Sequence, residues 1–162
     1  MTAGRVDTGA VGARLDYLHR QAELLRELPT DQGKLTEKLR DPFVYNGAVH
    51  LLQTSIEALI DIAYHLCARL HATAPENGVQ AFEILVSHAD LPQDFLRRAV
   101  PMVRFRNLVV HGYLPTDPAA VQRIISGHLE DFAVAERLIR AIVARSGGEV
   151  GSEGPPQPGK GD

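Results

Sequence analysis

The segment RFRNLVVHGY, residues 104–113, places polar side chains with catalytic potential inside a short, otherwise apolar run. The groups that stand out are Arg106, Asn107, His111 and Tyr113. A helix that only fills a core has no need of all four. Histidine titrates near neutrality, so His111 could take a proton from a ribose 2′-hydroxyl or give one to a leaving oxygen. The planar, permanently charged fork of Arg106 matches two phosphate oxygens.

A proton-transfer group and a clamp for transition-state charge are the minimum for cutting RNA without a metal ion. Arg106 and His111 are five residues apart, which is about 140° around an ideal helix, so their spacing alone does not build a site. The long stem of Arg106 would have to reach along the helix, while Asn107 would orient the imidazole or hold the helix end. Because one histidine is poorly suited to be both acid and base, a second copy from a symmetric partner is attractive.

Each of these residues also has an ordinary structural interpretation. A histidine at a helix C-terminus often acts only as a favourable cap charge. An arginine on a helix is usually solvated or ion-paired, and a tyrosine after a helix end usually packs across a bundle. Glu57, Asp61 and His65 recur every four residues, so they form one row on a predicted helix. That row would most often be a solvated face, or would supply a partner for an arginine such as Arg106.

The chain has 162 residues, enough for one domain with a real core. Its formal net charge of −3 argues against a protein that coats nucleic acid non-specifically, because such binding relies on many phosphate contacts. A local basic patch remains, with four arginines and no acid from Arg97 to Arg106. The single cysteine, Cys67, excludes an internal disulfide, and no run approaches the ~18 apolar residues of a membrane helix. We therefore expect a cytoplasmic protein.

Apolar residues at three- and four-residue steps predict helices along most of the chain. The expected helices span residues 11–28, 31–40, 43–72, 78–90, 92–100, 102–111 and 117–146. Pro101 is expected to break or kink the chain between the fifth and sixth of these. Gly112 should be the left-handed residue that ends the sixth immediately after His111. Asp117 and Pro118 are suited to the N-cap and the first position of the last helix.

The predicted fold class is all-α, an up-and-down bundle of four to five main helices. We expect residues 1–10 to be frayed and residues 11–145 to form one helical domain. Residues 146–162 are rich in glycine and proline and have almost nothing to bury. We expect them to form a flexible, disordered C-terminal tail.

Two segments carry a family resemblance. LLQTSIEALIDIAYHL, followed by MVRFRNLVVHGY, is similar to the HepT-type toxins, a branch of the HEPN superfamily. The superfamily's hallmark is an arginine followed, after four to six residues, by a histidine, commonly with a polar residue after the arginine. Arg106, Asn107 and His111 match this pattern. Tyr113 matches a tyrosine that the HepT branch carries two residues beyond the histidine.

The resemblance covers the predicted helical domain. It implies a HEPN-like helical homodimer that is a metal-independent ribonuclease, with an RNA substrate that is either tRNA or mRNA. The lack of a long apolar run separately predicts no membrane association. Arg106 and His111 carry over as catalytic residues, with Asn107 in support and no cofactor. For Glu57 and Asp61 the family offers only that this helix often carries an acid near the motif arginine, so both are candidates for supporting that arginine.

The resemblance also implies a partner, an MntA-type nucleotidyltransferase antitoxin. This partner would silence the toxin by transferring AMP from ATP onto Tyr113. Added phosphates beside Arg106 would occupy its fork, and the nucleotide would block the path of the RNA.

Two other interpretations stay open at the level of the sequence. The chain could be a non-catalytic nucleotide- or substrate-binding helical subunit of a nucleotidyltransferase complex, which would suit its acidic net charge. It could also be a purely structural bundle, in which case the motif is a coincidence. Cleavage of RNA in EDTA, lost in variants of His111 and Arg106, separates the ribonuclease from both.

Overall fold

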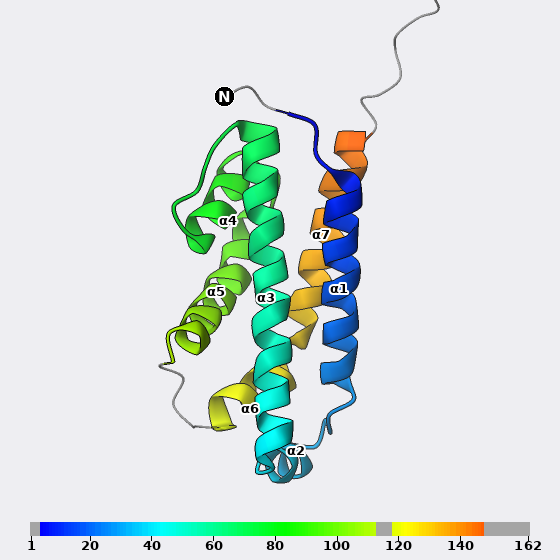
Figure 1. Ribbon diagram of the computed structural model, residues 1–162, viewed down its shortest axis with the longest axis vertical. Helices are drawn as coiled ribbons and strands as arrows, with labels where there is room; N and C mark the ends of the chain where they lie inside the picture. The colour runs from blue at the N-terminus through cyan, green and yellow to red at the C-terminus, as the bar shows by residue number, and fades with distance from the viewer. Residues whose placement is uncertain (1–3, 113–117, 148–162) are drawn as a thin grey trace, which may run out of the picture.

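The computed structural model describes residues 4–112 and 118–147 (Figure 1). The regular structure of these residues is helical throughout, which confirms the predicted all-α fold class. The helices are α1 (Thr8–Arg26), α2 (Gln32–Lys38), α3 (Pro42–His71), α4 (Gly78–Ser87), the 3-10 turn η1 (Gln93–Phe95), α5 (Leu96–Val110), α6 (Pro118–Gly127) and α7 (Leu129–Gly147). None of the described helices is both long and apolar enough to cross a membrane.

The longest helix, α3, is the centre of the bundle. On one side it packs against α1, which in turn packs against α7 (Figure 1). On the other side α3 contacts α4 and α5, and these two helices also contact each other. The short helices α2 and α6 contact each other at one end of the bundle (Figure 1). As a result, α5 lies directly on α3.

The sequence of α3 explains its central position. The Asp41 side chain accepts the Phe43 N–H at 2.8 Å and Pro42 takes the first position, so the start of the helix is well defined. A wide apolar stripe then faces neighbours on several sides. The buried residues of α3 are Ala48, Leu52, Ser55, Ile56, Ala58, Leu59, Ile60, Ile62, Ala63, Leu66 and Cys67. Each fully buried leucine or isoleucine contributes roughly 1.5–3 kcal/mol to folding.

The N-terminal segment of residues 1–10, expected to be frayed, packs against the bundle from Gly4 onward. The Gly4 N–H donates to the Arg69 carbonyl at 2.8 Å, and Val6 is buried in the core. Helix α1 begins at Thr8, three residues earlier than predicted. The expectation was wrong for the described part of this segment because a small apolar residue and backbone hydrogen bonds anchor it to α3.

Helix α5 runs through Pro101 without interruption, so the expected division into two helices was wrong. Proline has no N–H, and the helix therefore loses the hydrogen bond that would reach the Arg97 carbonyl. Ala99 and Val103, on either side of the proline, are both buried. Their packing keeps the two halves of α5 against the core despite the missing bond.

The last predicted helix is in fact two. Helix α6 ends at Gly127, and α7 starts after a turn at His128. Glycine is a poor helix former, and the turn is stabilised locally. The His128 carbonyl accepts the Asp131 N–H at 3.1 Å, and the His128 Nδ1 lies 3.1 Å from the Asp131 Oδ2. A carboxylate in the first turn of α7 also suits the positive end of that helix.

Three predictions fall wholly or partly outside the described residues. They are the N-cap role of Asp117, every role of Tyr113, and the disordered tail from residue 146. Helix α7 continues to Gly147, so the first two residues assigned to that tail are helical.

His65 joins the N-terminal segment to α3. Its Nε2 accepts the Asp7 N–H at 3.0 Å, which requires that this nitrogen carries no proton. Burial lowers the pKa of His65, and the charges of Arg69 and Arg14 act in the same direction against an opposing effect of Asp7. The neutral imidazole that the contact needs is therefore favoured.

This contact predicts a specific pH dependence of stability. The folded-state pKa of His65 is lowered, so its contribution is present above the unfolded value of about 6.5 and is lost as the pH falls through the folded value. Urea denaturation at about pH 7.5 and about pH 5 should show a larger loss of unfolding free energy for the wild type than for His65→Gln. The protection of the Asp7 amide from hydrogen exchange, measured relative to an unstructured peptide at the same pH, should fall over the same range. Identical pH dependence in the two proteins would rule out this role.

Candidate active site at the end of α5

Helix α5 ends as the sequence predicted. The last helical residue is Val110, and His111 follows as C-cap with its N–H donating to the Asn107 carbonyl at 3.0 Å. Gly112 then adopts φ +70°, a left-handed conformation that side-chain-bearing residues rarely take. Its N–H donates to the Val109 carbonyl at 3.1 Å. This ending places the exposed His111 at the tip of the helix.

Arg106 is held on another flank of α5, against α3. Its Nε lies 3.4 Å from the Glu57 Oε1, and its Nη1 donates to the Asn107 Oδ1 at 3.2 Å. The same Glu57 oxygen accepts the Gln53 Nε2–H at 3.1 Å. The Nε is shielded from solvent and makes no hydrogen bond of good geometry within the described chain, so its contact with Glu57 is an ion pair. The guanidinium is thus positioned by one carboxylate and one amide.

The row of Glu57, Asp61 and His65 does not act as one unit. Glu57 reaches Arg106, whereas Asp61 lies 3.9 Å from the Arg14 Nε on α1. His65 contacts the N-terminal segment. The suggestion that both acids support Arg106 is therefore supported for Glu57, while the observed partner of Asp61 is Arg14. Successive side chains on this face of α3 therefore contact different segments of the bundle.

The exposed side of α5 forms a second row that ends at His111. Its members recur at three- and four-residue steps and are Arg97, Pro101, Arg104, Leu108 and His111. Arg106 lies off this row, about 140° around the helix from His111. One chain therefore presents an imidazole on the exposed side of α5 and a guanidinium on the side that meets α3.

Sequence reasoning missed Gln53, although a signal was present. It precedes Glu57 by one helical turn, the spacing at which side chains on a helix interact. Within the described residues, no three or more His, Cys, Asp or Glu side chains gather as metal ligands would. The polar groups that do converge are the arginine, its carboxylate and the two amides of Gln53 and Asn107.

The comparison with known proteins identifies the family. The model of the family described as ribonuclease HepT-like matches residues 18–139. The chain belongs to this family. The HepT-like chain is also 31% identical, over 113 residues, to the mRNA nuclease HepT of Shewanella oneidensis. That alignment covers 70% of this chain and 79% of the relative.

Solved structures share the fold of this HepT-like chain. A tri-AMPylated HEPN toxin of Shewanella oneidensis, in complex with MNT antitoxin, has a TM-score of 0.73 at 23% identity and covers 82% of this chain and 97% of its own. A toxin–antitoxin complex with AMP-PNP gives a TM-score of 0.71 at 23% identity, again covering 82% and 97%. YutE of Bacillus subtilis, a cytosolic protein of unknown function, gives 0.75 at 18% identity and covers 90% and 96%. The predicted HEPN-like fold and the HepT resemblance are confirmed.

The ion pair between Arg106 and Glu57 predicts a measurable coupling. A double-mutant cycle with Arg106→Met and Glu57→Gln should give about 0.5–1 kcal/mol in the free energy of unfolding, because the pair is partly shielded from water. Urea denaturation at one fixed protein concentration measures it.

The matched control is a cycle of Arg106→Met with Asp61→Asn. These two changes should be additive within about 0.5 kcal/mol, because Asp61 contacts Arg14 instead. Stronger coupling of Arg106 to Asp61 than to Glu57 would contradict the described geometry.

Proposed function

We propose that this HepT-like chain is a metal-independent ribonuclease toxin, acting in the cytoplasm on mRNA or tRNA and neutralised by an MntA-type antitoxin. The observation that carries the proposal is the exposed imidazole of His111, fixed at a helix end by Gly112, on the same helix as a guanidinium held by Glu57. The name of the Shewanella relative, an mRNA nuclease, supports RNA as the substrate.

The proposed reaction needs only side-chain chemistry. An imidazole takes the proton of a ribose 2′-hydroxyl, and the freed oxygen attacks the adjacent phosphorus while the bond to the 5′-oxygen breaks. A protonated imidazole returns a proton to that leaving oxygen. The Arg106 guanidinium binds phosphoryl oxygens and stabilises the charge that accumulates on them. The products carry a 2′,3′-cyclic phosphate and a 5′-hydroxyl.

In the proposed reaction, a homodimer supplies the second imidazole that one chain lacks. Each chain has a single motif histidine, and its Arg106 and His111 lie on different sides of α5. Two exposed apolar side chains flank the end of the helix, Leu108 at 44% and Val110 at 47% of full exposure. Packing two copies around this end would bury those side chains and bring two imidazoles to one cleft. We therefore place the twofold axis near the C-terminal turns of α5.

The regulatory half of the proposal concerns Tyr113, two residues beyond His111. Transfer of AMP from ATP to this hydroxyl by the antitoxin would add a phosphate and a nucleoside beside the catalytic groups. The phosphate would compete with RNA for the fork of Arg106. The AMPylated state named for the Shewanella toxin supports this form of control.

The nuclease proposal predicts loss of cleavage from two single changes. Wild-type protein should cut total RNA or tRNA in EDTA. His111→Ala and Arg106→Ala should each be slower by at least about a hundredfold, because the first loses an acid–base group and the second loses a group that stabilises transition-state charge. His50→Ala and Arg20→Ala change exposed residues on α3 and α1 and should keep wild-type activity. Gel analysis of the fragments gives the rates. A folded wild type that leaves all RNA intact would favour the non-catalytic binding subunit.

Titrating wild type with His111→Ala tests the shared cleft. If two imidazoles serve one cleft, a mixed dimer retains only one of them and lacks either the acid or the base. Cleavage per wild-type chain should therefore fall as the variant is added in excess. Cleavage per wild-type chain that stays constant, despite exchange of subunits shown by mass spectrometry, would place a complete site in a single chain.

The control proposal predicts a mass increase that depends on Tyr113. Co-expression with the nucleotidyltransferase should raise the intact mass by whole AMP groups and abolish RNA cleavage, because the modification occupies the site. Tyr113→Phe should stay unmodified, while Tyr17→Phe, a change in a half-buried tyrosine of α1, should be modified normally. Modification that persists in Tyr113→Phe would assign the reaction to another residue.

A further inference from the structure

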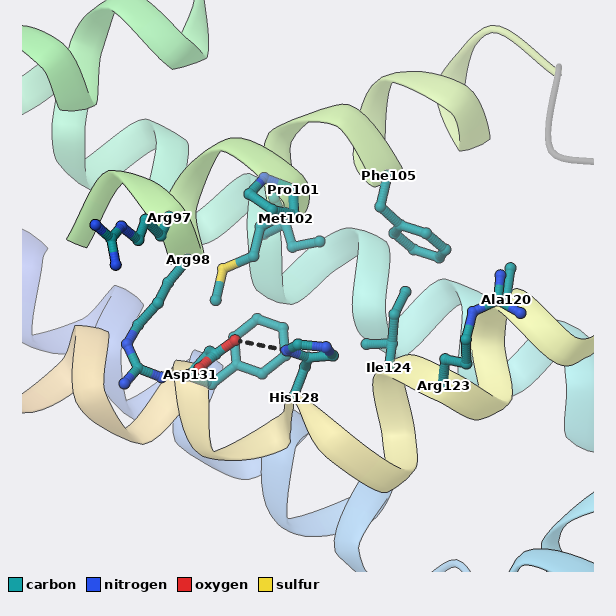
Figure 2. Close-up of a pocket in the computed structure, with 12 residues that line it drawn as sticks. Arg97, Arg98, Pro101, Met102, Phe105, Ala120, Arg123, Ile124, His128 and Asp131 are labelled. Atoms are coloured by element: carbon teal, nitrogen blue, oxygen red, sulfur yellow. Dashed lines mark hydrogen bonds and ion pairs between the residues drawn. The ribbon is translucent and has the colours of Figure 1, made fainter. Parts of the chain in front are cut away.

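A pocket of about 420 Å³ opens between α5, α6 and the start of α7 (Figure 2). Its floor is apolar and includes Met102, Phe105, Ile124 and Phe132. In Figure 2 the Phe105 ring projects from α5 toward Ile124 on α6. Pockets of a few hundred Å³ with an apolar lining and few polar groups are the usual form of small-ligand sites.

The polar groups of this pocket are mostly basic side chains. Arg97 and Arg98 come from α5, Arg123 from α6 and His128 from the turn before α7. The one carboxylate in the lining, Asp131, is buried and already paired with two partners. It forms an ion pair with Arg98 and lies 3.1 Å from the His128 Nδ1.

Arg97 and Arg123 remain available at the edge of the pocket. Across residues 4–112 and 118–147, neither they nor Arg104 has a carboxylate within ion-pairing distance, and all three are exposed. Two guanidinium groups that have no carboxylate partner in the described part of the chain, above an aromatic and aliphatic floor, suit a ligand that combines negative charge with a flat apolar body.

The pocket adjoins the exposed row of α5 that leads to His111. Arg97 belongs to both, and Arg97, Arg104 and His111 are spaced by seven residues along one face. Their Cα atoms span about 21 Å along the helix axis. An extended anionic chain that starts at His111 would meet Arg104 and then Arg97 on its way to the pocket.

We infer that this pocket holds one nucleobase of the RNA substrate, with the adjoining phosphates bound by Arg97 and Arg123. The inference rests on the proposed ribonuclease function and adds a binding site upstream or downstream of the cut. The base packs on Phe105, Met102 and Ile124, and the strand follows α5 past Arg104 to the cleft at His111. Such a site would let a protein with a negative net charge bind single-stranded RNA at a defined position.

The test uses a bulky side chain to fill the pocket. Ala120 lines it from α6 and is half-buried, so Ala120→Trp places an indole in its mouth. Ser126→Trp puts the same group on the exposed surface of α6 and is the matched control. Binding of single-stranded RNA is measured by fluorescence anisotropy in the His111→Ala background, which leaves the RNA intact. We expect Ala120→Trp to weaken binding about tenfold and Ser126→Trp to leave it unchanged.

A second arm removes charge without filling space. Arg123→Gln should weaken binding several-fold and reduce its salt dependence, because one phosphate contact is lost. Arg20→Gln on α1 removes the same charge from a distant exposed position and should have little effect. Since Arg123 is exposed, this variant also covers the case in which Ala120→Trp fails to fold.

RNAs with a single abasic residue locate the pocketed base. RNA that is abasic at one position, fixed relative to the cut, should bind the His111→Ala protein more weakly than intact RNA does. Adding Ala120→Trp should not weaken the binding of this abasic RNA any further. Strong RNA binding and cleavage that none of the pocket changes affects would overturn the pocket and leave the nuclease intact. A folded wild type that neither binds nor cuts RNA would overturn both. Pocket changes that weaken only antitoxin binding would assign the surface to a protein partner instead.

Discussion

A guanidinium whose Nε is shielded from water needs a negative partner, and in this chain that requirement fixes how α5 lies on α3. Glu57 provides the partner at 3.4 Å, and Gln53 holds the same carboxylate oxygen from one turn away. Buried Ala99 and Val103 pack the same helix against the core. Together these contacts set the rotation of α5 about its axis. That rotation directs Arg106 toward α3 and leaves His111 on a side that faces solvent.

The arginines of α5 and their neighbours divide into groups with different roles. Arg98 is paired with Asp131 and helps hold α5 to α7, and Arg106 is paired with Glu57 in the candidate site. Arg97 and Arg104 point to solvent without a carboxylate within ion-pairing distance in the described chain. A net charge of −3 therefore coexists with a basic strip on one helix. Local charge, rather than the total, decides where an anionic strand would bind.

Sequence patterns predicted the helices where one local rule dominated, and failed where tertiary packing decided. The left-handed end of α5 followed from Gly112, because few other residues tolerate that conformation. Pro101 did not break the helix, because the buried residues on both sides of it outweigh one lost hydrogen bond. The split at His128 depended on contacts with Asp131 that helical periodicity does not reveal.

The same distinction applies to the candidate site. The four-residue spacing placed Glu57 and Asp61 on one face of α3, but that face borders both α5 and α1, so periodicity could not assign Arg106 to the first and Arg14 to the second. The pocket beside α5 joins side chains from four helices and the turn at His128, and it left no local signal in the sequence. The role of Tyr113 stays a prediction, since it lies outside the described residues.

The charge at the end of α5 also bears on the proposed control, the modification of Tyr113 two residues beyond His111 in the sequence. The C-terminus of a helix carries partial negative charge, so a phosphate placed there is unfavourable unless cations neutralise it. The nearest cations on the helix are Arg104 and Arg106, which are also the groups an RNA phosphate would use. An AMP group on Tyr113 would therefore be stabilised by the same arginines whose occupation prevents binding of the substrate. The contact that neutralises the added phosphate would then also block the substrate. Inhibition would therefore need no rearrangement of the bundle.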